Sequence, residues 1–289
     1  MKAMETSKGV LGQDHPDTLT SMANLASTYR NQGRWKEAEE LEVKVLETRK
    51  RVLGREHPDT LTSMANLAST YRKQGRRMES EELDVKAMET RQRVLGQEHP
   101  DTLESMANLA STCRNQPGAE ELVVKVLETR KRILGQEHPS TLISMANLAT
   151  TCRNQGRLKD AEELGVMVVE ISLRVLGQEH PDILISMASL AVTYMKQGRW
   201  KEAEELEVGA MEVRKRVLGQ GHPDTLASMA NLAHIWRSQG RIAKAIDMLT
   251  QAVSPCSSVI GNDHPDSSAW MSTLKAWRDV TQKSPLDDI

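Results

Sequence analysis

Apolar residues recur at steps of three and four along residues 16–31, the spacing of one face of an α-helix. They are Leu19, Met22, Leu25, Ala26 and Tyr29. Residues 36–53 carry a second pattern of this kind, whose apolar positions are Ala38, Leu41, Val45, Leu46, Val52 and Leu53. Acidic residues lead this second stretch and basic residues end it, an order that complements the helix dipole at both ends. The pattern therefore predicts two consecutive amphipathic helices.

Proline and glycine mark the ends of these two helices. Pro16 suits the first turn of a helix, where a missing N–H costs nothing. Gly33 is expected to end the first helix, and Gly54 the second. Because the turn at Gly33 is short, the two helices are expected to form an antiparallel hairpin.

A His-Pro dipeptide precedes the hairpin and recurs at His15, His57, His99, His138, His180, His222 and His264. Each step is 42 residues except that from His99 to His138, which is 39. Residues 15–30 and 57–72 are identical. A fixed period of this size predicts stacked hairpins that bury their apolar faces against one another. The predicted repeats are 15–56, 57–98, 99–137, 138–179, 180–221 and 222–261, preceded by a half-repeat over 1–14 and followed by a degenerate capping helix and tail over 262–289.

Several positions break the repeat. Residues 1–12 align with residues 84–96, so the chain opens within a second helix, which indicates a fragment or a truncated product. The 39-residue step removes three residues near residues 115–120, which we expect to make a weak joint. Cys113 and Cys152 replace the residue equivalent to Tyr29 and are expected to be buried and inert. Pro255 is expected to end or kink the helix in which it falls.

Composition narrows the class of protein. The 289 residues carry 38 Lys and Arg against 40 Asp and Glu, so no basic surface for nucleic acid is indicated. No apolar run approaches the roughly 18 residues needed to cross a membrane. Three cysteines without metal spacing argue against a disulfide framework and for a reducing compartment, so a cytoplasmic location is expected.

The repeat resembles the tetratricopeptide pattern. Met22, Leu25, Ala26 and Tyr29 stand at the positions of W-x2-L-G-x2-Y, and Ala38 opens the second helix, whereas Glu42 departs from the expected Phe. The 42-residue unit, with ANLA, EAEEL and LGQEHP segments, resembles the kinesin light chain type and the repeat arrays of fungal NB-ARC/NACHT (STAND-type) receptors. This resemblance implies an all-α fold, a right-handed α-solenoid of helical hairpins.

A variable stripe on the first helices carries the candidate binding residues. Positions two before, five after and nine after the repeated Met differ between repeats, and their spacing places them on one helical face. The position two before the Met holds Thr20, Thr62, Glu104, Ile143, Ile185 and Ala227. The position five after it holds Ser27, Ser69, Ser111, Thr150, Val192 and His234. The resemblance implies that this stripe lines a concave groove. The alternative is that these positions vary through neutral sequence drift, on a surface that contacts no ligand.

Two columns of polar residues accompany the stripe. The first is Asn24, Asn66, Asn108, Asn147 and Asn231, with Ser189 as the exception; the second is Arg30, Arg72, Arg114, Arg153 and Arg237. The resemblance implies that the amides bind the backbone of a peptide, and an amide can both donate and accept. The guanidinium groups would favour an acidic partner. The alternatives are amides that bond a neighbouring repeat and arginines that form solvated helix ends.

The sequence favours a non-catalytic scaffold that binds a protein or peptide in its groove. No cofactor is expected. The alternative is the ligand-sensing repeat region of a fungal receptor-like protein whose nucleotide-binding domain lies outside this chain. A phosphate-binding G-x-x-x-x-G-K-[ST] loop and the H-E-x-x-H, C-x-x-C and G-x-S-x-G motifs are missing. One His for each repeat does not suit a metal site, because packed helices lie about 8–10 Å apart. We therefore interpret the His residues as helix-start residues.

Overall fold

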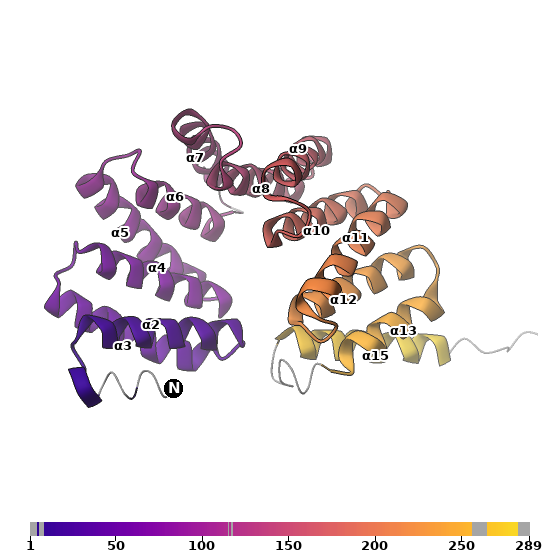
Figure 1. Cartoon of the computed structure of the whole chain (residues 1–289), viewed down its shortest axis with the longest axis horizontal. Coiled ribbons are helices and arrows are strands. Elements are labelled where there is room, and N and C mark those ends of the chain that lie inside the picture. Colours follow the sequence, from indigo (N-terminus) through magenta and orange to yellow (C-terminus); the bar gives the residue numbers. More distant parts are fainter. Residues whose placement is uncertain (1–4, 6–8, 115, 117, 256–264, 283–289) are drawn as a thin grey trace, which may run out of the picture. The chain divides into compact units, whose positions relative to one another are not determined.

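The computed structural model describes residues 5, 9–114, 116, 118–255 and 265–282, and Figure 1 shows its helices. They are α2 (Pro16–Asn31), α3 (Trp35–Val52), α4 (Pro58–Lys73), α5 (Arg77–Leu95), α6 (Pro100–Thr112), α7 (Ala119–Leu134), α8 (Pro139–Asn154), α9 (Leu158–Leu176), α10 (Pro181–Lys196), α11 (Trp200–Leu218), α12 (Pro223–Ser238), α13 (Ile242–Val253) and α15 (Pro265–Gln282). Every regular element in these described ranges is an α-helix.

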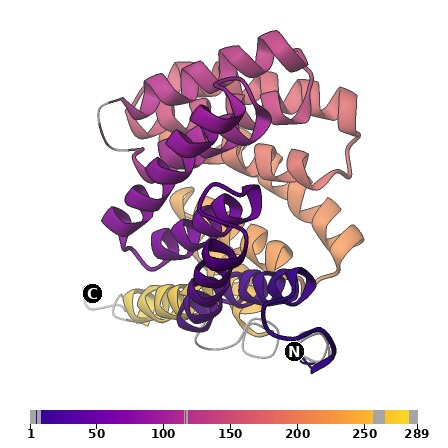
Figure 2. The same ribbon diagram turned by 90° about the vertical axis from the view of Figure 1, so that its left-hand side faces the viewer.

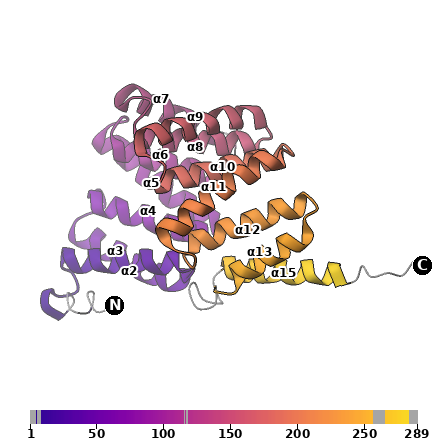
Figure 3. The same cartoon turned by 45° about the vertical axis from the view of Figure 1, so that its right-hand side comes forward.

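The chain divides into two compact units, an N-terminal unit of residues 1–133 and a C-terminal unit of residues 134–289. In the N-terminal unit, shown in Figure 2, α2 pairs with α3 and α4 with α5. In the C-terminal unit, shown in Figure 3, α8 pairs with α9, α10 with α11 and α12 with α13. Each second helix also packs on the next first helix within its unit, as α3 does on α4. The predicted helical hairpins are thus present in both units.

Each first helix is capped by the histidine that precedes its proline. His57 Nδ1 accepts a hydrogen bond from the backbone N–H of Asp59 at 3.1 Å, and Pro58 occupies the first helical position. The same bond recurs at His15, His99, His138, His180 and His222. The cap satisfies one of the backbone donors that a helix start leaves without a partner. The prediction that these histidines are helix-start residues is confirmed.

The core consists of small and aliphatic side chains. Leu61 and Met145 are buried, as are Ala26 and Ala68. The repeated Met is buried in the core at Met22, Met64, Met106, Met145 and Met229. In the N-terminal unit, α6 packs on α7 through Leu103, Met106 and Val126. Because no residue is Phe, aliphatic side chains from neighbouring helices fill most of the core, and Trp277 of α15 is a buried aromatic member.

A polar network joins the hairpin turn of one repeat to the second helix of the repeat before it. Gln74 Nε2 donates to Glu39 Oε2 at 2.8 Å, and Arg76 Nη1 donates to Glu39 Oε1 at 2.7 Å. The Arg76 guanidinium also stacks on the ring of Tyr71. The same network recurs with Gln197, Arg199 and Glu162, and with Gln239, Arg241 and Glu204.

The irregular positions fall where the sequence indicates. Cys113 and Cys152 are free thiols and buried, and burial raises the pKa of Cys113 to about 11. The helix α13 ends at Val253, two residues before Pro255, so the predicted end is confirmed. At the C-terminal side, Leu274 and Trp277 of α15 pack on α12 and α13.

Some predictions fall on residues outside the described part of the chain. They concern residues 1–4 and 6–8 of the half-repeat, residues 115 and 117 of the shortened turn, and residues 256–264 and 283–289. Among the described helices, none has the length and apolar character that a membrane span requires.

Candidate binding surface

A polar cavity of about 280 Å³ opens between α4 and α6 of the N-terminal unit. It is lined by Arg30, Thr62, Ala65, Asn66, Ser69, Arg72, Asp84, Arg91, Asp101, Glu104 and Asn108. Most of these residues belong to the predicted stripe or to its Asn and Arg columns. The structure therefore brings candidate residues of three consecutive repeats to one place.

Consecutive first helices of this unit touch each other: α2 contacts α4, and α4 contacts α6. Thr62, Asn66 and Ser69 follow each other on α4 at steps of four and three, so they share one face. That face borders the cavity. The part of the predicted stripe that lies on α4 thus faces the polar cavity, and its place in a concave groove stays a prediction.

The amides of Asn66 and Asn108 are available in the cavity. Both residues are half-buried, and neither side chain has a hydrogen bond to another residue of the described part of the chain. An amide offers two donors and one acceptor oxygen, the set that pairs with a peptide group. Asn147 of the C-terminal unit is also half-buried without a side-chain hydrogen bond to a described residue, whereas Asn24 is exposed on α2 and Asn231 Nδ2 donates to Glu207 Oε1 at 3.4 Å.

Two buried acids at equivalent repeat positions, Glu42 and Glu207, accept from different donors. Glu42 is 3% exposed, and its Oε1 accepts from Arg30 Nη1 at 2.9 Å. At the equivalent place in the fifth repeat, the arginine is replaced by Met195, and Glu207 instead accepts from Asn231. Burial raises the pKa of both carboxyls above its ordinary range. The two acids thus have different donors, an arginine at Glu42 and the amide of the next repeat at Glu207.

The arginines of the first helices also bridge consecutive repeats. Arg30 Nη1 donates to the backbone oxygen of Asn66 at 3.1 Å. Arg153 Nη1 donates to the backbone oxygen of Ser189 at 2.8 Å. Arg114 is exposed at the end of α6. The role of these arginines as ligand contacts stays a prediction, and Arg30 and Arg153 already hold structural hydrogen bonds.

A second column of arginines, on the second helices, was not among the candidate residues. Arg49 Nη1 donates to Ser63 Oγ at 3.0 Å, and Arg91 Nη1 donates to Ser105 Oγ at 2.8 Å. Their Nη2 atoms reach the stripe, at Thr20 Oγ1 and Thr62 Oγ1. The near-constancy of arginine at this repeat position is the sequence signal that would have found them.

The cavity carries both signs of charge. Its cations are Arg30, Arg72 and Arg91, and its acids are Asp84, Asp101 and Glu104. Asp84 Oδ2 accepts from Thr112 Oγ1 at 2.7 Å, and burial raises the pKa of this carboxyl while it lowers the pKa of Arg72. The cavity thus contains opposite charges, and two amides in it make no hydrogen bond to a described residue. Such a cavity is better suited to the polar main chain of a peptide than to a single, strongly charged side chain.

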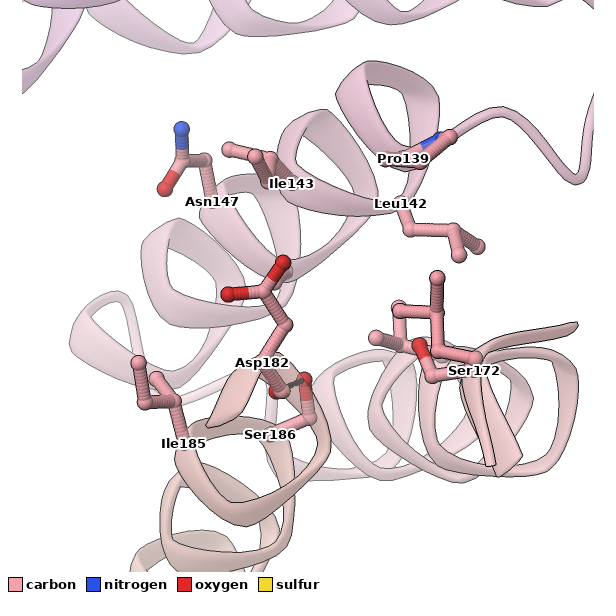
Figure 4. A pocket seen from close by; sticks show the side chains of 11 residues that line it. Pro139, Leu142, Ile143, Asn147, Ser172, Asp182, Ile185 and Ser186 are labelled. Carbon is pink, nitrogen blue, oxygen red and sulfur yellow. Dashed lines mark hydrogen bonds between the residues drawn. The ribbon is translucent and has the colours of Figure 1, made fainter. Parts of the chain in front are cut away.

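The stripe changes character in the C-terminal unit. Two positions before the repeated Met, its residues there include Ile143 and Ile185, which are 50% and 61% exposed. They border a cavity of about 290 Å³ between α8 and α10, shown in Figure 4. It is lined by Pro139, Leu142, Ile143, Ala146, Asn147, Val168, Ser172, Leu176, Asp182, Ile185 and Ser186. The two cavities thus offer a polar and a largely apolar surface.

The matches to a known family coincide with the repeat found in the sequence. The tetratricopeptide repeat family matches residues 18–59, 60–101, 102–140 and 141–182, and again residues 182–254. The chain belongs to the tetratricopeptide repeat family. Such repeats form protein–protein interaction scaffolds, and the all-α solenoid of tetratricopeptide hairpins predicted from the sequence is confirmed. No protein of the curated set matches this tetratricopeptide chain.

Solved structures of tetratricopeptide proteins resemble the chain. The kinesin light chain-like repeats of Podospora anserina are 29% identical, with a TM-score of 0.45, over 84% of this chain and 97% of theirs. A STAND protein with a tetratricopeptide sensor from Pyrococcus horikoshii is 14% identical, with a TM-score of 0.61, over 96% and 41%. A Rap protein complexed with competence and sporulation factor is 12% identical, with a TM-score of 0.58, over 98% and 85%. The similarity to the last two structures shows that this chain shares their fold.

Proposed function

We propose that this tetratricopeptide chain is a non-catalytic scaffold that binds an extended peptide segment of a partner along the inner face of its first helices. The observation that carries the proposal is the polar cavity between α4 and α6, in which the amides of Asn66 and Asn108 make no hydrogen bond to another residue that the structure describes. Each amide can donate to a peptide carbonyl and accept from a peptide N–H. Hydrogen bonds to the peptide backbone would supply affinity, and the variable stripe would supply specificity for the partner's side chains.

The chemistry of the partner follows from the residues around the amides. Arg72 and Arg114 would favour acidic side chains in the partner, while Arg30 is already paired with Glu42. Thr62 and Glu104 would select among side chains that point toward the stripe. We place the interaction in the cytoplasm, because the cysteines Cys113 and Cys152 are buried free thiols and fit a reducing compartment.

The test is a comparative capture of partners by two matched variants of the full chain. Asn66→Asp with Asn108→Asp keeps the shape of both side chains, removes their N–H donors and adds two charges. Gln92→Glu with Gln97→Glu adds the same charge at two exposed positions outside the cavity. A partner that is retained by the control and lost by the first variant, with circular dichroism unchanged, supports the groove. Equal capture by both variants contradicts it.

A second candidate function is the ligand-sensing region of a STAND-type receptor. It is favoured by the likeness to the Pyrococcus horikoshii protein, whose structure contains a tetratricopeptide sensor and of which the likeness covers 41%. In that case binding in the groove would act on a nucleotide-binding domain. A nucleotide-binding domain encoded next to these repeats in the same reading frame would support this candidate, and a transcript that encodes the repeats alone would oppose it.

A further inference from the structure

The cavity between α8 and α10 lies where other repeats place a buried arginine. Arg49, Arg91, Arg130 and Arg214 occupy one position of the second helices and are 5–8% exposed. The equivalent residue of the fourth repeat is Ser172, in the segment VVEISLRVLG that aligns with VLETRKRVLG of the first repeat. Ser172 lines the cavity. The cavity therefore marks a missing arginine side chain.

Three junctions show what the missing side chain would touch. The guanidinium groups of Arg49, Arg91 and Arg214 donate to the hydroxyls of Ser63, Ser105 and Ser228 on the next first helix. Arg49 and Arg91 also donate to the backbone oxygens of Asp59 and Asp101. In the fourth junction, Ser186 and Asp182 stand at these two positions and both line the cavity. The acceptors of the guanidinium are retained although the arginine is absent.

The walls of the cavity suit the same side chain. Leu142, Val168 and Leu176 are apolar and can cover the methylene stem of a long side chain. Asp182 is the one charged residue among those that line the cavity, and Figure 4 shows its carboxylate directed into the space between α8 and α10. The hydroxyl of Ser172 has no hydrogen bond within the described residues. The cavity thus combines an apolar shaft with a negative end.

We propose that this cavity binds an arginine side chain of the partner, which completes the junction between the fourth and fifth repeats from outside. Ile143 and Ile185, exposed at the entrance, would pack on the residues that flank this arginine. The volume of about 290 Å³ is at the lower end of ligand sites, which fits a single side chain. This inference rests on the proposed function for the source of the arginine, and it concerns a different unit from the polar cavity.

The test uses two capped amino acids as probes on the full chain. Acetyl-arginine N-methylamide presents the side chain in a peptide setting, and acetyl-citrulline N-methylamide is its neutral analogue of the same shape. Ligand-observed NMR titration is expected to show about tenfold tighter binding of the arginine probe, because its hydrogen bonds and charge meet Asp182. Equal binding of both probes, or binding of neither, would overturn the proposal. Tighter binding of free arginine than of the capped form would assign the cavity to a metabolite and overturn the partner assignment.

Variants locate the binding and separate it from folding. Ser172→Arg supplies the missing side chain from within, so it is expected to abolish binding of the probe and to raise the unfolding midpoint. Asp182→Asn is expected to weaken binding about tenfold, whereas the matched Asp224→Asn, at the junction that Arg214 fills, leaves it unchanged. Should Ser172→Arg not fold, Asp182→Asn decides alone. Because these probes need no partner, the result is independent of the capture experiment with Asn66 and Asn108.

Discussion

Arg30 donates from Nη1 to the backbone oxygen of Asn66, which lies 3.1 Å away and 36 residues further along the chain. The same nitrogen donates to the buried carboxylate of Glu42 at 2.9 Å. One guanidinium therefore neutralises an internal acid and ties two consecutive first helices together. The Asn66 side chain itself makes no hydrogen bond to another described residue and borders the cavity.

Replacement of Arg30 by Met should destabilise the N-terminal unit by about 3 kcal/mol, because Glu42 would be left charged and buried without a partner. The double variant Arg30→Met with Glu42→Leu should recover most of this loss, since no charge then remains to be compensated. Urea unfolding of the two variants measures the difference. An additive or larger loss in the double variant would contradict this role of the pair.

Glu207 should make stability depend on pH. Burial raises the pKa of its carboxyl in the folded chain, so the folded state holds the proton to higher pH than the unfolded state, whose value is about 4.3. Stability from this group is present below that value and is lost as the pH rises through the raised pKa. The thermal unfolding midpoint of Glu207→Gln should therefore rise relative to that of the wild type as the pH rises. The control Glu205→Gln, exposed on the same helix, should follow the wild type, and parallel curves for Glu207→Gln would refute the assignment.

The histidine caps give a prediction that does not depend on any partner. His57→Ala removes the acceptor of the Asp59 N–H and should cost about 1 kcal/mol of stability. His57→Asn offers a side-chain oxygen at the same place and should retain most of that stability. Equal destabilisation of the two variants in urea unfolding would show that the bond contributes nothing.

Hydrogen exchange should be fastest near residues 113–122 and beyond Pro255. The third repeat has lost three residues from its turn, and its sequence there has no arginine equivalent to Arg76, which bonds Glu39 in the preceding junction. Nearest-neighbour arrays open first at their weakest interfaces. Mass spectrometry of the exchanged full chain measures this profile, and uniform protection along the chain would oppose it.

The helices and their order could be predicted from the sequence, because their signals are local. Pro58 opens a helix and Gly75, with φ of 80°, follows its end, and apolar spacing identifies the face that packs. The repeat then extends each local prediction along the chain. The identical segments 15–30 and 57–72 form helices of the same length, α2 and α4.

The roles of individual site residues could not be predicted, because they depend on the neighbouring repeat. Asn66 and Asn231 are the same residue at the same repeat position, yet one amide is free and the other binds Glu207. The preceding repeats also differ, with Arg30 in one and Met195 in the other. The departure of Ser172 from the arginine of four other repeats can be read in the sequence, but only the packing of α8 and α10 beside it reveals the cavity.

Photo-crosslinking from the rim of the polar cavity tests whether a partner peptide binds beside Asn66 and Asn108. A benzoylphenylalanine introduced at the exposed Glu104 would lie beside a peptide bound to Asn66 and Asn108, whereas the same group at the exposed Gln92 on α5 would not. If the peptide binds at the inner face, a captured partner crosslinks through one short segment from position 104 and gives no crosslink from position 92. Crosslinking from position 92 and none from position 104 would contradict binding at the inner face.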